Sequence, residues 1–111
     1  MAFSLDHVVR FHQTDAAGVM YFAQGLVLCH STYEASLQAA AIDPKVFFGG
    51  GEVACPILHA AMDYHRPLRC GDLVTVELTA VPLDGTSFEV SYQLYGPDPD
   101  QMAATAITRH V

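Results

Sequence analysis

The chain has 111 residues, of which 51% are hydrophobic and 15% charged, and its formal net charge is −7 at pH 7. This length predicts a single domain, residues 1–111, and the apolar composition excludes a disordered linker. With five basic residues in total, the chain lacks the basic surface that DNA or RNA requires, and no apolar run approaches the roughly 20 residues of a membrane-spanning helix.

The first half of the chain predicts a strand followed by a long buried helix. Residues 4–11 have a strand pattern. From residue 26 to residue 42, apolar side chains recur at the three- and four-residue spacing of a helix on two neighbouring faces. A helix that is apolar around most of its circumference is buried, so other elements must wrap it. Asp43-Pro44 ends the predicted helix, and the glycines at 49–51 predict a loop.

The second half of the chain predicts strands joined mainly by tight turns. The strand patterns cover residues 53–65, 74–80, 88–94 and 102–111. Pro56 places the start of the first of them at an edge or a bulge, and Asp84-Gly85 is typical of a β-hairpin turn. Tight turns require an antiparallel sheet. The chain therefore predicts an α+β fold, in which an antiparallel five-stranded sheet curls around one long central helix.

The cysteines and the apolar excess indicate the environment of the protein. Cys29, Cys55 and Cys70 are far apart and include no C-x-x-C pair, which argues against a zinc cluster and favours thiols in a reducing cytoplasm. So many apolar residues in a small chain indicate that another subunit covers part of its surface. We therefore expect a homo-oligomer in the cytoplasm.

The segment between the first strand and the helix carries the main candidate for chemistry. Residues 14–22 place Asp15, Gly18 and two aromatic residues, Tyr21 and Phe22, just before a buried helix. Asp is favoured both as a helix N-cap and in turns, so spacing alone leaves a purely structural role open for Asp15. Gly18 is suited to a special backbone shape and to the close approach of a substrate.

Residues 14–22 resemble the signature of the 4-hydroxybenzoyl-CoA thioesterase family of hotdog proteins, in which an Asp, two small residues, a Gly and an aromatic pair open the central helix. Within this family the likeness is closest to the cyanobacterial 1,4-dihydroxy-2-naphthoyl-CoA hydrolases. It extends to further motifs at Cys29-His30, Tyr33-Glu34, residues 56–60, Pro67 and residues 70–72. The resemblance covers nearly the whole chain and implies a hotdog fold. The sequence stops at Val111, where similar proteins usually continue, so either this protein lacks that tail or the sequence is incomplete.

The chemistry of thioester hydrolysis explains why such a short motif suffices. The leaving thiol has a pKa of roughly 8–9 and departs as a thiolate without a positioned general acid. A carboxylate can attack as a nucleophile or act as a general base on water. Backbone N–H groups at a helix N-terminus can stabilise the oxyanion. By resemblance, Asp15 takes the first role and the amide of Phe22 the second. No cofactor is expected, because coenzyme A is part of the substrate.

Several other residues are candidates for substrate binding. By resemblance, Gly18, Tyr21 and His59 are expected near the substrate, although His59 also fits a hydrogen-bonded structural role. Coenzyme A brings phosphates to an acidic protein, and Arg66 and Arg69 are the best-placed basic residues, with solvated surface arginines as the alternative. Phe47 and Phe48 fit either the core or the wall of an aromatic acyl pocket.

Three further pairs of residues are weaker candidates for a chemical role. His30 and Glu34 are four residues apart on the helix and can touch, which favours a bonded pair that orients the helix and leaves a supporting catalytic role open. Asp63 and His65 are typical metal ligands, but no third ligand lies at a suggestive spacing, so no metal is expected. Cys29 cannot pair with its neighbour His30, because adjacent helical residues point about 100° apart.

The residues and the resemblance together predict a cytoplasmic homodimer or homotetramer that hydrolyses an aromatic acyl-CoA. The expected substrate is 1,4-dihydroxy-2-naphthoyl-CoA, an intermediate of phylloquinone and menaquinone biosynthesis. One alternative is an acyl-CoA thioesterase of broader specificity. Another is a non-catalytic hotdog subunit that binds acyl-CoA, against which the presence of Asp15 speaks.

Overall fold

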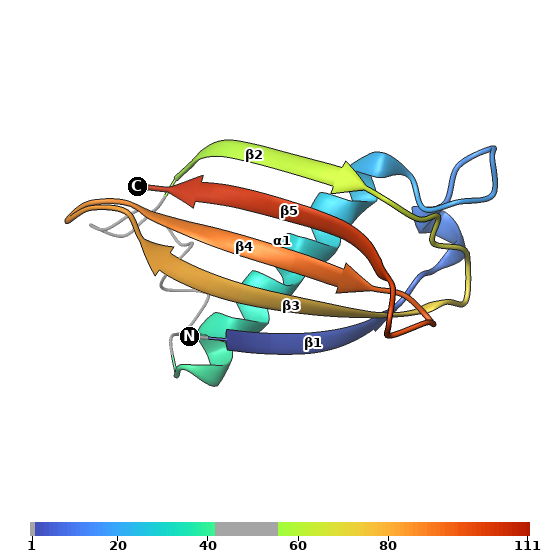
Figure 1. The fold of residues 1–111 in the computed structure, drawn as a ribbon, viewed down its shortest axis with the longest axis horizontal. Helices are drawn as coiled ribbons and strands as arrows, with labels where there is room; N and C mark the ends of the chain where they lie inside the picture. Colours follow the sequence, from blue (N-terminus) through green and yellow to red (C-terminus); the bar gives the residue numbers. More distant parts are fainter. Residues whose placement is uncertain (1, 42–55) are drawn as a thin grey trace.

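The structure is a computed structural model that describes residues 2–41 and 56–111. A strand is followed by a helix and then by four more strands, as the sequence predicts (Figure 1). The elements are β1 (Ala2–Val8), a short 3-10 helix η1 (Phe11–Gln13), α1 (Phe22–Ala39), β2 (Ile57–Tyr64), β3 (Leu73–Pro82), β4 (Phe88–Tyr95) and β5 (Met102–His110). The α+β class and the five-stranded antiparallel sheet are confirmed.

The five strands form one curved sheet in the order β1-β3-β4-β5-β2, and every neighbouring pair is antiparallel. Helix α1 crosses one face of this sheet diagonally (Figure 1). β1 and β2 are therefore the edge strands, and the segment that carries Asp15 links β1 to the start of α1.

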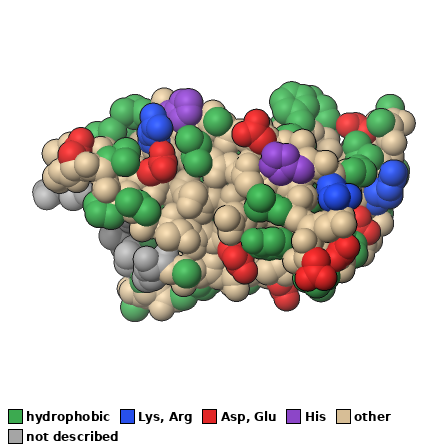
Figure 2. Space-filling model, viewed as in Figure 1, with side chains coloured by type: hydrophobic (Ala, Val, Ile, Leu, Met, Phe, Trp, Pro, Cys, Tyr) green, Lys and Arg blue, Asp and Glu red, His purple; other side chains and the backbone are tan. Residues whose placement is uncertain are grey.

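The core lies between α1 and the inner face of the sheet. Alternate residues of β3, β4 and β5 point inward because successive side chains of a strand face opposite sides. The buried inward residues include Val76, Val90, Tyr92, Leu94 and Ala104, and α1 contributes Leu28, Cys29 and Tyr33. The outer face carries polar residues at the intervening positions, and Figure 2 shows its acidic and basic side chains scattered rather than gathered in one patch.

The helix is less enclosed than its sequence predicts. The sheet covers one side of α1, whereas Val27 on the other side is 51% exposed. Among residues 2–41 and 56–111, the sheet packs on one side of α1 and apolar surface on the other side stays exposed. No helix in the described ranges is long and apolar enough to cross a membrane.

The element boundaries differ from the predicted ones by up to a turn. The strand predicted over residues 4–11 ends at Val8, and α1 starts at Phe22 rather than at residue 26. The helix ends at Ala39, and Ala41 takes a left-handed conformation with φ 62°. The hairpin turn forms as predicted, with the Asp84 carboxylate accepting the N–H groups of the two residues that precede β4. The predicted features at residues 42–55 lie outside the described residues.

Candidate active site

The loop that carries Asp15 is a compact turn closed by backbone hydrogen bonds. Thr14 and Met20 form an isolated antiparallel bridge at its base. The N–H of Asp15 donates to the carbonyl of Val19 at 3.0 Å, and the N–H of Gly18 donates to the carbonyl of Asp15 at 2.9 Å. Gly18 has a φ of 79°, a conformation that favours glycine. The backbone role predicted for Gly18 thus matches the shape of this loop.

The carboxylate of Asp15 lies at a hollow of about 360 Å³. Its Oδ1 accepts the N–H of Ala17 at 2.8 Å, which holds the side chain on its own loop. The hollow is lined by Asp15, Val19, Met20, Phe22, Tyr64, His65, Arg66, Pro67 and Leu68. These residues come from the Asp15 loop, the start of α1, the end of β2 and the connection to β3. We refer to this space as the Asp15 hollow.

The start of α1 borders the same hollow. Tyr21 has an extended backbone (φ −63°, ψ 135°) and precedes Phe22, the first helical residue. The N–H of a first helical residue has no intrahelical acceptor and carries part of the positive end of the helix dipole. Phe22 is 65% exposed, and its ring centroid lies 4.8 Å from that of Tyr21. The structure thus brings Asp15 and Phe22 together, as the resemblance implies.

Tyr64 joins this site, although no motif in the sequence points to it. Its hydroxyl donates to the backbone carbonyl of Phe22. Burial raises the pKa of Tyr64 above its usual value, with a further contribution from the nearby Cys29, so the hydroxyl keeps its proton. Tyr64 could have been found from the alternation along β2, which places Ala60, Met62 and Tyr64 on the face toward α1.

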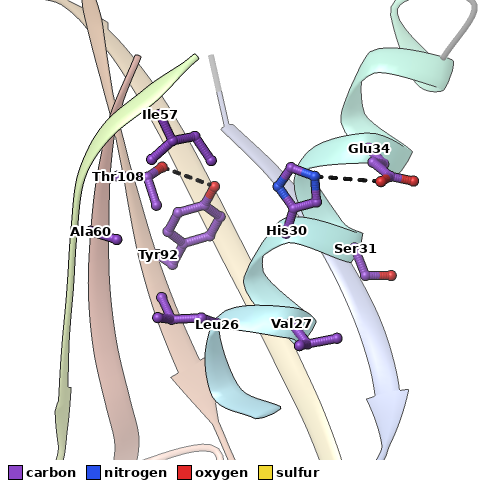
Figure 3. A pocket seen from close by; sticks show the side chains of 9 residues that line it. All are labelled: Leu26, Val27, His30, Ser31, Glu34, Ile57, Ala60, Tyr92 and Thr108. Carbon is purple, nitrogen blue, oxygen red and sulfur yellow. Dashed lines mark hydrogen bonds and ion pairs between the residues drawn. The ribbon is translucent and has the colours of Figure 1, made fainter. Parts of the chain in front are cut away.

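A larger groove of about 590 Å³ lies between α1 and strands β2, β4 and β5 (Figure 3). Its walls include Leu26, Ile57 and Ala60, and it has polar groups at one end, where the hydroxyl of Tyr92 lies 3.3 Å from that of Thr108. Asp15 thus borders the smaller hollow and not this groove.

His30 and Glu34 line this larger groove rather than the Asp15 hollow. Nε2 of His30 lies 3.5 Å from Oε1 of Glu34, so the two side chains touch as their spacing predicts (Figure 3). Both side chains are about half exposed, with 41% and 49% of their surface accessible. Their position favours an orienting role over a direct part in the chemistry around Asp15.

The two predicted arginines have different positions. Arg66 lines the Asp15 hollow, whereas Arg69 lies in the following turn and is not part of that lining. The backbone N–H of Arg69 donates to Oδ2 of Asp72 at 2.8 Å, which stabilises the turn before β3. Of the two candidates for phosphate binding, Arg66 is thus the one beside the carboxylate.

His59 faces away from the hollow. It pairs with Arg109 in β5, and the neighbours of Arg109, Thr108 and His110, are buried against α1. Residues opposite each other in an antiparallel pair point to the same side, so His59 lies on the outer face of the sheet. In one protomer, the structure therefore does not bring His59 to Asp15.

The cysteines and candidate metal ligands form no second centre in the described part of the chain. No group of three or more His, Cys, Asp or Glu residues in residues 2–41 and 56–111 could hold a metal ion. Cys29 is buried, which raises the pKa of its thiol to about 12, and Cys70 is exposed; both are free thiols. Cys55, Phe47 and Phe48 lie outside the described residues.

In the described residues, one α-helix lies across a curved antiparallel sheet and a loop with a carboxylate precedes the helix. These features define a hotdog protein of the thioesterase type. Residues 9–111 match the family model of the thioesterase-like superfamily, and the chain belongs to this family.

Several relatives carry a more specific name. The chain is 46% identical over 107 residues to the 1,4-dihydroxy-2-naphthoyl-CoA hydrolase of Crocosphaera subtropica, which covers 96% of this chain and 78% of the relative. It is 49% identical over 104 residues to the enzyme of the same name from Rippkaea orientalis, over 93% and 75% of the two chains. Among solved structures, the 1,4-dihydroxy-2-naphthoyl-CoA thioesterase from Synechocystis matches with a TM-score of 0.94 and 33% identity, over 100% of this chain and 81% of that chain.

Proposed function

We propose that the protein hydrolyses 1,4-dihydroxy-2-naphthoyl-CoA to the free acid and coenzyme A. The observation that carries this proposal is the meeting of Asp15 and the first turn of α1 at one hollow. The relatives described above support the substrate, because they bear this activity in their names and match nearly the whole chain.

The site suits the cleavage of a thioester. With the thioester carbon in the Asp15 hollow, the carboxylate either attacks it to form a mixed anhydride or takes a proton from an attacking water. The carbonyl oxygen becomes an oxyanion and accepts a hydrogen bond from the N–H of Phe22. The C–S bond then breaks, and the thiolate of coenzyme A leaves without a general acid because it is a weak base. On the anhydride route, water then hydrolyses the mixed anhydride, which releases the free acid and restores the Asp15 carboxylate. Neither step needs a metal or an added cofactor.

Arg66 supports recognition of coenzyme A in this proposal. Its guanidinium is positively charged at every physiological pH and can bind a phosphate with paired hydrogen bonds. Arg66 lines the hollow, and in this proposal its long side chain extends away from Asp15, along the pantetheine arm and toward the phosphates. Arg69 is a secondary candidate at the adjacent turn, and Gly18 and Tyr21 are proposed substrate contacts because they belong to the segment that links Asp15 to α1.

The proposal includes assembly into a homodimer or homotetramer in the cytoplasm. Edge strand β2 exposes apolar side chains, with Ile57 44% and Leu58 69% exposed. An apolar edge strand is prone to pair with another chain, and the open side of α1 around Val27 adds apolar surface nearby. A second copy covers this surface in our proposal. The free thiols of Cys29 and Cys70 are compatible with a reducing compartment.

The test is thiol release from a panel of aryl- and alkyl-CoA thioesters by the wild type and by Asp15→Asn. This substitution keeps the shape of the side chain and removes its charge, so turnover should fall by about 10²- to 10⁴-fold. Asp63→Asn is the matched control, because Asp63 is exposed on the opposite face of the sheet, and its turnover should equal that of the wild type.

Each outcome of this test separates one hypothesis from the others. Fast release confined to the dihydroxynaphthoyl ester and lost in Asp15→Asn supports the proposal. Comparable rates on alkyl esters indicate a thioesterase of broader specificity. Equal turnover in the wild type and Asp15→Asn rules out Asp15 as the catalytic carboxylate, and no turnover on any ester indicates a non-catalytic subunit.

A further inference from the structure

Tyr64 and Phe22 connect the end of one element to the beginning of another at the Asp15 hollow. Tyr64 is the last residue of β2 and Phe22 the first of α1, and 42 residues separate them in the chain. The Tyr64 hydroxyl donates to the Phe22 carbonyl. Both residues line the hollow with Asp15, so this hydrogen bond lies at the site itself rather than in the distant core.

Gly25 provides the space that this hydrogen bond needs. A Cβ atom at residue 25 would collide with the Tyr64 hydroxyl and would lie 2.6 Å from Cε and 2.7 Å from Sδ of Met62. Contacts below 3.0 Å are essentially absent for real Cβ atoms. Glycine is unfavourable inside a helix, so its presence in the first turns of α1 is explained by the close approach of β2.

The segment on the other side of the hollow is held in the same way. The N–H of Met20 donates to the carbonyl of Leu68 at 2.6 Å, which ties the chain just before α1 to the connection after β2. The N–H groups of His65 and Arg66 both donate to the carbonyl of Ala103, at 2.8 and 3.0 Å, and anchor this connection to β5. Both ends of the short stretch from Met20 to Phe22 are thus hydrogen-bonded to the end of β2 and the connection that follows it.

We propose that Tyr64 is a positioning residue for thioester hydrolysis, because its hydroxyl holds the first turn of α1 and thereby directs the Phe22 N–H toward the hollow. This inference rests on the function proposed above. The first turn of a helix lacks intrahelical partners for its N–H groups, so contacts from outside the helix set its orientation. An oxyanion donor acts only when it lies about 2.7–3.1 Å from the charged oxygen, so a small tilt of this turn weakens it.

The first test is Tyr64→Phe, which removes the hydroxyl and keeps the ring. One lost hydrogen bond that acts in the transition state should lower kcat by about 3- to 10-fold. KM should stay within about twofold of the wild-type value, because substrate contacts are retained. Tyr95→Phe is the control, since the Tyr95 hydroxyl donates to Gln93 at 3.3 Å on an exposed part of β4, and its kcat should be unchanged.

The second test is Gly25→Ala. This variant retains the Tyr64 hydroxyl, but the added Cβ atom displaces it from the Phe22 carbonyl. It should lower kcat as much as Tyr64→Phe does. The double variant should be no slower than either single variant, because both remove the same interaction and their effects are then not additive. The pH profile of kcat should keep the shape of the wild-type profile in all three, because Asp15 is unchanged.

Two results would overturn the positioning role. One is a wild-type kcat for Tyr64→Phe, and the other is a double variant whose loss is the product of the two single losses. Asp15→Asn measured in parallel separates the two proposals. If Asp15→Asn is inactive and Tyr64→Phe has the wild-type kcat, the positioning role alone fails; if the wild type cleaves no thioester, both proposals fail.

Discussion

His7 of β1 and Thr32 of α1 are joined by a hydrogen bond of 2.9 Å between Nε2 and Oγ1. The Thr32 hydroxyl donates its own proton to the carbonyl of Leu28 at 2.8 Å. It therefore accepts from His7, which must carry a proton on Nε2. Thr32 is fully buried, so this bond ties an edge strand to the middle of the helix.

We predict that protonation of His7 weakens the folded state. Burial lowers the pKa of His7 below its usual value of 6.5, although the neighbouring Asp6 acts in the opposite direction. Between the folded and the unfolded pKa, the unfolded chain binds more protons, so stability rises with pH there. The contribution of His7 is therefore complete above pH 6.5 and is lost as the pH falls through the lower, folded pKa.

The measurement is urea unfolding of the wild type and His7→Gln at a series of pH values from about 5 to 8. Glutamine can still donate an N–H to Thr32 but does not titrate, so the variant should lose less stability on acidification. Every other ionisable group is common to the two proteins and cancels in the difference. Asp6 and Arg10, which line the same surface hollow as His7, are also present in both proteins. Parallel pH dependences of the two proteins would contradict this role of His7.

Most helices and strands of the fold were predictable from the sequence because their signals are local. The alternation in residues 74–80 predicts β3, and the three- and four-residue spacing after residue 26 predicts most of α1. The apolar spacing predicts a helix that starts at residue 26, a turn later than the observed start at Phe22, because Gly25 interrupts the pattern. That glycine is explained by the approach of Tyr64 and Met62, which belong to a distant part of the chain.

The candidate site was predictable where residues are neighbours in the chain and not where they meet through the sheet. Asp15 and Phe22 are separated by one short loop, so the motif itself places them together. The orientation of His59 depends on the pairing of β2 with β5 and on the register shift between Ile57 and His59. The contact of Tyr64 with Phe22 depends on the same pairing. Such pairings are not encoded in any local pattern.

Gly18 allows a test of the conformation of the Asp15 loop. Its φ of 79° is costly for any residue with a Cβ atom, although nothing lies within 4 Å of the position that this atom would take. We predict that Gly18→Ala lowers the free energy of unfolding by about 1 kcal/mol through backbone strain alone. It should also lower kcat, because relief of the strain moves the loop that carries Asp15.

The matched control for Gly18 is Gly85→Ala in the β3–β4 turn. Gly85 also has open space around its Cβ position, but its φ lies outside the left-handed region. The free energy of unfolding of Gly85→Ala should stay within about 0.5 kcal/mol of the wild-type value. Urea unfolding and thiol-release assays measure both variants. Equal losses of stability in the two would show that backbone strain at Gly18 does not shape the loop.

Arg66 allows a test of how the acidic protein meets the phosphates of coenzyme A. We predict that Arg66→Gln raises KM for the dihydroxynaphthoyl-CoA ester by about 3- to 10-fold, because an exposed arginine–phosphate contact contributes modestly. The value of kcat should change little, since the side chain does not act on the thioester carbon. Added salt should raise KM of the wild type more than KM of the variant, because salt screens the arginine–phosphate interaction that only the wild type makes.

The corresponding pantetheine thioester distinguishes a phosphate contact from an acyl contact. This ester carries the same acyl group and lacks the nucleotide phosphates, so Arg66→Gln and the wild type should have the same KM for it. Arg69→Gln is the matched variant from the neighbouring turn, outside the lining of the Asp15 hollow, and its KM for the coenzyme A ester should change less. If Arg66→Gln raises KM equally for both esters, the guanidinium contacts the part that they share, and the phosphates are bound elsewhere.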